Sequence, residues 1–207
     1  MNDPVNDEDL RLLLLIRHFE TALLELFGHG LLHGTTHTCL GQEPVPVALR
    51  PLLHAEDFVF SNHRGHGHYL ARFDDPTGLL AEIMGREGAV CGGIGGSQHL
   101  KRGRYLSTGV QGESLPVAAG AALHLAHHEP GRLACVHIGD GTWGEGAVYE
   151  ALNMAAPAAT GRLSPCTPVD RYLPRLRCWL PPIPPQTAPS RPMISARRPV
   201  GSSKRAR

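Results

Sequence analysis

The residues with the clearest chemical potential are the triplet Gly139-Asp140-Gly141, which follows a short apolar run and precedes a helical pattern. Two glycines let the backbone approach an anion closely, and the N-terminus of the following helix offers unpaired N–H groups. Asp140 would repel a phosphate placed directly against it, but it suits a hard cation such as Mg²⁺ lying between carboxylate and phosphate. A tight turn with a solvated aspartate explains the triplet alone equally well.

The sequence around this triplet predicts one unit of a doubly wound parallel sheet. The apolar run 132–138 is typical of a buried strand, and residues 116–128 and 143–156 are typical of the helices on either side of it. Thr142 and Glu145 have the spacing of a capping box for the second helix. Such a unit requires another strand next, and the run ATGRLSPCTP with its two prolines does not predict one.

The remaining predicted elements precede this unit. They are a helix after Asp7-Glu8-Asp9 that ends near Gly28, a helix over 42–53, a strand over 57–62 that runs into a loop HRGHGH, a helix capped by Thr77 that ends at Gly85, and a glycine-rich loop over 88–97. In the first helix, apolar residues recur at helical spacing and predict its buried face: Leu12, Ile16, Phe19, Leu23 and Leu26.

Composition divides the chain near Ala156. Residues 157–207 contain ten of the twenty Lys and Arg but only one acid, Asp170, although the whole chain has a net charge of +1. We therefore predict an incomplete α/β domain over 1–156 and a Pro/Arg-rich, disordered tail over 157–207. A shift of reading frame near residue 156 is the simplest explanation of the change. Without further strands, Val148, Ala151 and Leu152 are expected to lack packing partners, which predicts a poorly stable chain.

The sequence shows neither a signal peptide nor an apolar run long enough to span a membrane. Its five cysteines have no C-x-x-C spacing, which favours reduced thiols and a cytoplasmic protein. His63, His66 and His68 alternate, but no carboxylate or cysteine stands at ligand spacing to support a zinc site with them.

Seven segments in order resemble the alpha chain of the thiamine-diphosphate-dependent first component of 2-oxoacid dehydrogenase complexes, of the pyruvate, branched-chain and acetoin types. They are RHFE…LF, GTTHTCLGQEPVPVA, SNHRGHGHYLA, GLLAEIMGR, GGIGGSQHL, TGVQGESLPVAAGAAL and GDGTWGEGAVYEALNMAA. The resemblance covers residues 1–156 and implies an open α/β sheet that binds the diphosphate half of the cofactor, while a second chain supplies the pyrimidine half.

The resemblance also implies roles for individual residues. Asp140 would be the protein ligand of Mg²⁺. The other residues implied to bind thiamine diphosphate are His63, Arg64, Gly109, Gln111, Gly139, Gly141 and Thr142. Candidate catalytic residues, near substrate or cofactor, are His37, His66 and His99. His63 stands where many members of the family have tyrosine, so its role is the weaker inference.

The implied activity is an oxidoreductase reaction on an oxo group with a lipoyl disulfide as acceptor: a 2-oxo acid is decarboxylated and its acyl group passes to a lipoyl group. The implied partners are a beta chain, in a heterotetramer, and a lipoyl-bearing acyltransferase, with no role for nucleic acid or membrane. Two alternatives stay open, a catalytically inactive remnant of the family and a binding module that acts through its basic tail.

The family's second Mg²⁺ ligand is an asparagine 25–30 residues after the turn, and the chain has no asparagine after Asn153. Asp170 stands near that place, but the residues before it do not predict the buried strand that such a ligand would follow.

Overall fold

The computed structural model of the chain describes residues 5–32, 34–156 and 162–166, the last five by their backbone. All of them lie in a first compact unit, Met1–Leu176. Asp170, the basic end of the chain and most of the predicted tail lie outside the described residues. No helix among the described residues is long and apolar enough to cross a membrane.

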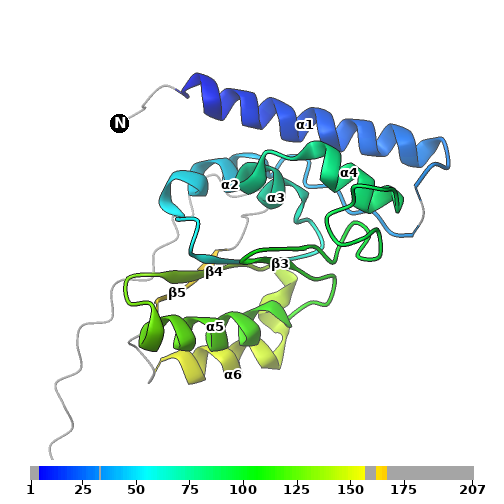
Figure 1. Cartoon of the computed structure of the whole chain (residues 1–207). Coiled ribbons are helices and arrows are strands. Elements are labelled where there is room, and N and C mark those ends of the chain that lie inside the picture. Colours follow the sequence, from blue (N-terminus) through cyan, green and yellow to red (C-terminus); the bar gives the residue numbers. More distant parts are fainter. Residues whose placement is uncertain (1–4, 33, 157–161, 167–207) are drawn as a thin grey trace, which may run out of the picture. The chain divides into compact units, whose positions relative to one another are not determined.

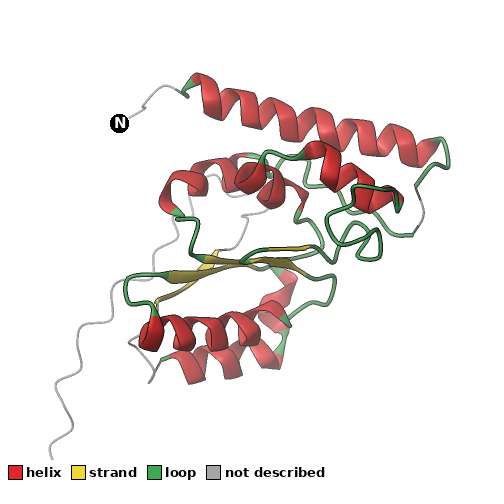
Figure 2. Ribbon diagram, viewed as in Figure 1, coloured by secondary structure: helices red, strands yellow, loops and turns green. Residues whose placement is uncertain are grey.

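A five-stranded sheet runs through the middle of this unit in the order β2-β3-β1-β4-β5 (Figures 1 and 2). The strands are β1 (Phe58–Ser61), β2 (Lys101–Arg102), β3 (Tyr105–Ser107), β4 (Leu133–His137) and β5 (Arg162–Cys166). β1 pairs in parallel with both β3 and β4, β4 pairs in parallel with β5, and only β2 is antiparallel. The predicted α/β class with a doubly wound parallel sheet is therefore confirmed.

Helices cover both faces of the sheet (Figure 1). On one face lie α1 (Asp7–Gly28), α2 (Pro44–Leu49) with the 3₁₀ turn η1 (Arg50–Leu52), α3 (His66–Phe73) and α4 (Pro76–Met84); on the other lie α5 (Ser114–His128) and α6 (Gly146–Ala155). Each face has its own apolar cluster, and two neighbouring residues of β1 belong to different clusters. Val59 belongs to the cluster with α1, α3 and α4, and Phe60 to the cluster with α5 and α6, because successive side chains of a strand point to opposite faces.

The first helix follows from its sequence. The Asn6 side chain accepts a hydrogen bond from the Asp9 N–H at 2.8 Å and so caps the N-terminus of α1, where the acids of the first turn complement the helix dipole. Four of the five predicted apolar positions are buried, namely Leu12, Ile16, Phe19 and Leu23, and Leu26 packs partly buried against them. The period of 3.6 residues therefore identified the core-facing side of α1.

The structure corrects the prediction that no strand follows the last helix. β5 pairs with β4 over five residues, with Ala134 opposite Leu163 and His137 opposite Cys166. It is the outermost strand of the described sheet, and Pro165 is tolerated there because an edge strand needs fewer N–H donors than an interior one. The sheet thus continues beyond the predicted domain end at residue 156.

The packing of the last helix was also predicted wrongly. Val148 and Ala151 are 0% and 3% exposed and belong to the cluster with α5 and β4, and Leu152 packs partly buried against it. Their partners include Leu115 and Val136. These positions are therefore packed within the described part of the chain, and the argument for a poorly stable chain loses this support.

Three local predictions also differ from the structure. The segment HRGHGH is not all loop, because α3 begins at His66. The N-cap of α4 is Asp75, whose carboxylate accepts from the Gly78 N–H at 2.9 Å, rather than Thr77. Thr142 and Glu145 form no capping box: the 3₁₀ turn η2 (Gly141–Gly144) intervenes, and α6 has no side-chain cap.

A substitution on the buried side of α1 tests this packing. Ile16 is fully buried in the first cluster, and Ile16→Ala should lower the free energy of unfolding by about 2–5 kcal/mol through lost burial and a residual cavity. Leu14→Ala is the matched control, since Leu14 is 48% exposed on the same helix. Denaturant unfolding measures both, and equal effects of the two variants would contradict the assignment of the core-facing side.

Candidate active site

The Gly139-Asp140-Gly141 turn lies directly after β4, at the carboxyl end of the strand. It is closed by hydrogen bonds from the Thr142 N–H to the Gly139 carbonyl at 3.1 Å and from the Trp143 N–H to the Asp140 carbonyl at 3.2 Å. Asp140 is exposed, and within the described residues its carboxylate has no hydrogen bond or ion pair. The one carboxylate of the turn is therefore available to an incoming cation.

The backbone of the turn is open to a ligand. A Cβ added at Gly141 would meet no atom within 4 Å, and one at Gly139 would reach only Thr142 Oγ1 at 3.6 Å and Gln111 Oε1 at 3.9 Å. Neighbouring protein atoms therefore leave enough space for a side chain at both positions, and packing does not explain the two glycines. Open space beside unsubstituted backbone is what a phosphate needs to approach the N–H groups closely, so the turn fits the diphosphate that the sequence implies.

Gln111 joins the turn to the segment after β1. Its Oε1 accepts a hydrogen bond from Thr142 Oγ1 at 2.9 Å, and its Nε2 donates to His63 Nδ1 at 2.6 Å. A ring that accepts at Nδ1 carries its proton on Nε2 when neutral. Burial lowers the pKa of His63, and the nearby His37 and Arg64 lower it further. His63 is therefore a neutral ring with one N–H left for a ligand.

Two further predicted residues lie beside His63. The His37 ring meets the His63 ring edge to face, with 4.8 Å between centroids. Arg64 is held by its backbone N–H, which donates to Asn62 Oδ1 at 3.0 Å, and by its guanidinium, which donates to the Thr38 carbonyl. Arg64 has no ion pair with an acid among the described residues, so the positive charge of its planar fork suits an anionic oxygen.

Gly109 connects this cluster to the glycine-rich loop. Its carbonyl accepts from Gln111 Nε2 at 3.3 Å. A Cβ at position 109 would lie 2.0 Å from Gln98 Oε1 and 3.4 Å from Gln98 Cβ, so the glycine permits this close approach. Gln98 precedes His99, which is exposed. His99 thus follows a residue that lies against Gly109, and within the described residues the His99 side chain makes no hydrogen bond.

The cofactor residues predicted from sequence therefore lie together, at the carboxyl ends of β1, β3 and β4. His37, His63, Gln111, Thr142 and Gly139 follow one another through direct contacts. Arg64, Gly109, Asp140 and Gly141 adjoin them in the same loops. In open α/β sheets this edge is where ligands bind.

His66 lies elsewhere. It is fully buried, and its Nδ1 contacts Glu20 Oε1 at 2.8 Å while its Nε2 contacts the Ser97 carbonyl at 3.0 Å. Both partners are oxygen atoms, one of a carboxylate and one of a backbone carbonyl. Cys39 Sγ donates to the same Glu20 oxygen at 3.2 Å. His66 thus ties α1, α3 and the loop at Ser97 together, which is a positioning arrangement rather than direct exposure to a ligand.

The sequence analysis missed Glu82, which organises the glycine-rich loop. Glu82 is 0% exposed, and its carboxylate accepts backbone N–H bonds from Cys91 at 2.6 Å, Gly93 at 3.0 Å and Gly95 at 2.7 Å. A Cβ at Gly95 would lie 1.9 Å from the His99 carbonyl oxygen, so the loop closes on itself there. A detectable signal existed, since Glu82 stands between Leu79 and Ile83 on the apolar side of α4.

Metal ligands are sparse at the site. Among the described residues, no group of three or more His, Cys, Asp and Glu side chains could hold a metal ion. Asp140 is the one carboxylate of the turn. A single carboxylate is compatible with a Mg²⁺ site in which phosphate oxygens and water supply most of the ligands. The carboxyl end of β5 lies at the same edge of the sheet, because His137 before the turn pairs with Cys166.

Comparison with known proteins identifies the family. The model described as the dehydrogenase E1 component matches residues 11–160. The chain belongs to this family. Among curated relatives in the dehydrogenase E1 component family, the alpha subunit of acetoin:2,6-dichlorophenolindophenol oxidoreductase from Bacillus subtilis (strain 168) is 38% identical over 147 residues, which is 70% of this chain and 44% of the relative.

Two relatives are named as pyruvate dehydrogenase E1 component subunit alpha. The protein from Zymomonas mobilis subsp. mobilis is 38% identical over 153 residues, covering 72% of this chain and 43% of its own length. The protein from Rhizobium meliloti is 36% identical over 149 residues, covering 70% of this chain and 43% of its own length. The chain therefore spans a little under half the length of these curated relatives. The region matched by the family model, residues 11–160, includes every residue of the cluster.

Glu82 gives a test of the loop that borders the cluster. Burial alone would raise its pKa, but the N–H donors of Cys91, Gly93 and Gly95 outweigh it and lower the pKa below 4.5. A depressed carboxyl pKa contributes stability that is full above the unfolded-state value and is lost as the pH falls through the folded-state value. Glu82→Gln should lower the free energy of unfolding at pH 7 by about 1–3 kcal/mol and flatten its decline between pH 5 and 3.

Urea unfolding across this pH range measures both effects. Glu129→Gln is the control, since Glu129 also has a lowered pKa, through its ion pair with Arg104, but lies near the surface. An effect of Glu129→Gln as large as that of Glu82→Gln would show that the buried network around Glu82 has no special role.

Proposed function

We propose that this chain forms the diphosphate-binding half of a thiamine-diphosphate site and acts as the alpha chain of a 2-oxoacid dehydrogenase first component. The observation that carries the proposal is the continuous set of contacts from His37 through His63, Gln111 and Thr142 to the Gly139-Asp140-Gly141 turn. It rests equally on membership of the dehydrogenase E1 component family and on relatives named for pyruvate and acetoin.

Each residue of the cluster has a role that its chemistry supports. Asp140 would bind Mg²⁺ with its free carboxylate, and the N–H group of Gly141 would face a diphosphate oxygen. Arg64 would neutralise a diphosphate oxygen with its unpaired guanidinium. Gln111 would hold the two sides of the site at a fixed separation, since it bonds Thr142 with one end of its amide and His63 with the other.

The histidines would act toward the rest of the cofactor and the substrate. His63 is neutral and has its Nε2–H available, so it would donate a hydrogen bond without adding charge. His37 is placed against His63, and we propose that it and the exposed His99 contact the 2-oxo acid. Thiamine diphosphate, when bound, supplies the carbanion chemistry that cleaves the bond between the keto carbon and the carboxylate; the protein binds and orients it.

The remaining parts of the proposed activity need other chains. We propose that a beta chain completes the site in a heterotetramer and that a lipoyl-bearing acyltransferase component accepts the acyl group, in the cytoplasm. His66 would contribute by holding the loop at Ser97, which leads to Gln98 and His99, rather than by contact with substrate.

Isothermal titration calorimetry with thiamine diphosphate tests the proposal, with and without Mg²⁺ and with and without the beta chain of a relative. Binding should require Mg²⁺ and should be at least about tenfold tighter with the beta chain present. Asp140→Asn should weaken the Mg²⁺-dependent binding by about tenfold or more, because a neutral amide oxygen is a weaker Mg²⁺ ligand than a carboxylate.

Asp74→Asn is the matched control. Asp74 is a surface acid paired with Arg11 in a left-handed conformation that asparagine also adopts. Mg²⁺-independent binding to the wild-type chain, or unchanged binding to Asp140→Asn, would contradict the assignment. Tight, stoichiometric binding by the chain alone would contradict the expectation that a beta chain completes the site.

A further inference from the structure

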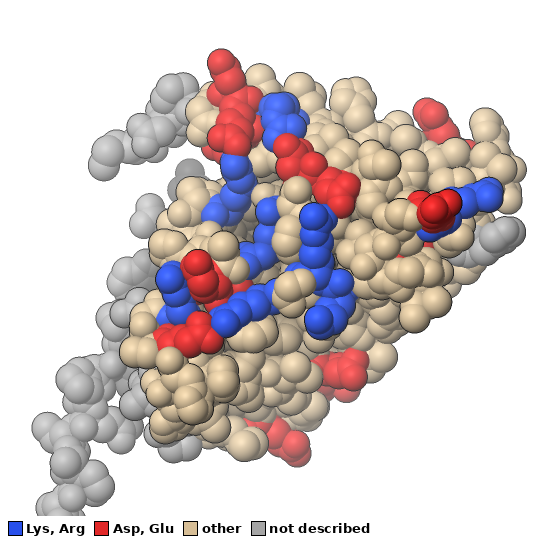
Figure 3. Space-filling model, in the orientation of Figure 1, with Lys and Arg blue, Asp and Glu red and all other residues tan. Residues whose placement is uncertain are grey.

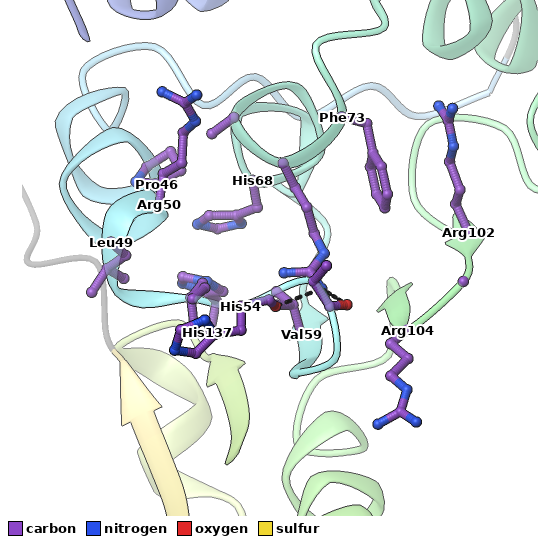
Figure 4. A pocket seen from close by; sticks show the side chains of 15 residues that line it. Pro46, Leu49, Arg50, His54, Val59, His68, Phe73, Arg102, Arg104 and His137 are labelled. Atoms are coloured by element: carbon purple, nitrogen blue, oxygen red, sulfur yellow. Dashed lines mark hydrogen bonds between the residues drawn. The ribbon is translucent and has the colours of Figure 1, made fainter. Parts of the chain in front are cut away.

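A second site candidate is a cavity of about 500 Å³ that shares no residue with the cofactor cluster. Its walls come from α2 and the segment after it, from α3, from the turn between β2 and β3, and from the end of β4 (Figure 4). This volume falls within the range of pockets that bind small organic molecules.

The polar side chains that line the cavity are all nitrogen-bearing, and none of its lining residues is an acid. They are Arg50, Arg72, Arg102, Arg104, His54, His68 and His137. The rest of the lining is mainly apolar and includes Pro46, Leu49, Val59 and Phe73, which stand around the same space as the histidines (Figure 4). Lys and Arg side chains gather across the middle of the face seen in Figure 3.

The arginines at the rim differ in how far they are neutralised. Arg102 pairs with Asp75 at 2.7 Å, Arg104 pairs with Glu129 at 2.7 Å, and Arg50 pairs with Glu8. All three acids lie outside the lining. The cavity therefore has fixed arginine side chains around it without a negative charge of its own.

Arg72 is the exception among these arginines, because no ion pair is found for it among the described residues. Its Nη2 donates to the carbonyls of Ala55 at 3.0 Å and Asp57 at 2.9 Å. The nearby Asp57 carboxylate already accepts backbone N–H bonds on both oxygens, from Leu133 at 3.0 Å and His54 at 2.7 Å. Arg72 is partly buried, which lowers its pKa. The charge of Asp57 acts on Arg72 through space, but among the described residues no carboxylate contacts its guanidinium, so an anion placed there would form a charge-assisted hydrogen bond.

His137 supplies the second independent observation. It is 2% exposed, and its Nδ1 is buried with no hydrogen-bond partner in the described part of the chain. Its ring stacks on that of His68, with centroids 3.7 Å apart, while His68 Nδ1 bonds Ser61 Oγ at 2.7 Å. Burial lowers the pKa of His137 to about 4 and that of His68 well below 6.5, so both rings are neutral near pH 7.

These groups form one row. His68 and Arg72 are four residues apart on α3 and so lie on the same side of that helix, and His137 stacks on His68. Cys135 Sγ lies 3.9 Å from His137 Nε2, and a thiol that donates to Nε2 leaves the proton of the neutral ring on Nδ1. A buried N–H without a partner is costly, and a ligand oxygen that accepts from Nδ1 removes that cost. The row thus offers an N–H donor and a guanidinium, with apolar residues beside them.

We propose that this cavity binds an organic anion, with its carboxylate or phosphate at Arg72 and His137 and its apolar body against Pro46, Leu49, Val59 and Phe73. The inference is independent of the proposed cofactor site and goes beyond it. A hydrated inorganic anion would leave the apolar wall exposed, whereas a neutral apolar molecule would leave the unpaired guanidinium and the buried Nδ1 unsatisfied.

Binding of three matched probes tests the proposal: 1-naphthyl phosphate, 1-naphthoate and the neutral 1-naphthol, titrated into the 207-residue chain by calorimetry. At least one anion should bind about tenfold more tightly than naphthol, and the tighter of the two identifies the preferred head group. Naphthol binding as tightly as both anions, or no binding of either anion, would overturn the proposal.

Variants locate the head group. Arg72→Gln should reduce the affinity for the anion by about tenfold and leave the affinity for naphthol unchanged. Arg50→Gln at the rim should reduce the affinity for the anion about threefold, and it leaves the hydrogen bonds from Arg72 to the backbone carbonyls intact. Arg11→Gln is the control, since Arg11 forms an exposed ion pair with Asp74 outside the cavity. Equal losses in Arg11→Gln and in the cavity variants would overturn the location.

Nuclear magnetic resonance of the imidazole nitrogens gives a readout that does not depend on any variant. The His137 Nδ1 signal should shift on saturation with the anion, because its N–H gains an acceptor, while the signals of the exposed His124 and His127 stay in place. An unchanged His137 signal at saturation would place the anion elsewhere and overturn the proposal.

Discussion

The parallel pairing of β1 with both β3 and β4 is the constraint on which the rest of the structure depends. Val59 pairs with Tyr105 on one side and Cys135 on the other, so the three strands end at one edge of the sheet. The loops after them carry His63, Gln111 and Thr142. These residues are far apart in sequence, and only a shared strand direction lets one glutamine amide reach both others.

Two buried carboxylates then fix the loops that surround this edge. Glu20 on α1 holds His66 and Cys39, and Glu82 on α4 holds the backbone of the glycine-rich loop. Burying a carboxylate costs free energy unless several donors satisfy it. Three backbone N–H donors bond the Glu82 carboxylate, so this loop has a defined conformation despite its many glycines, which by themselves favour flexibility.

Apolar periodicity accounts for the elements that sequence analysis predicted well. The 3.6-residue pattern of α1 and the unbroken apolar run of β4 identified their buried sides, and the glycine turn after β4 located Asp140. The proximity of the candidate site residues was predictable to the same extent, because the motifs of the family contain nearly all residues of the cluster; their roles stay predictions. Residue type and order were sufficient to predict which residues lie together, since the shared direction of the strands brings the motifs to one edge of the sheet.

The elements that sequence analysis missed depend on distant partners. α3 begins in a segment rich in histidine and glycine, and its helix is stabilised by burial of residues such as His66 and Tyr69 rather than by propensity. Gly67 fits there because a Cβ would lie 3.0 Å from Cys39 Sγ. β5 was missed because proline and arginine are atypical of a strand, whereas its pairing with β4 is a property of the sheet. Glu82 was missed because its donors come from another segment.

The alternation of Val59 and Phe60 has a consequence for how this unit opens. The two apolar clusters lie on opposite faces of the sheet, and β1 contributes a side chain to each. Neither helical layer can separate from β1 without exposing its own cluster. The amide protons of β1 should therefore exchange with solvent only when both layers open together, which makes this four-residue strand the element that couples the two halves into one cooperative unit.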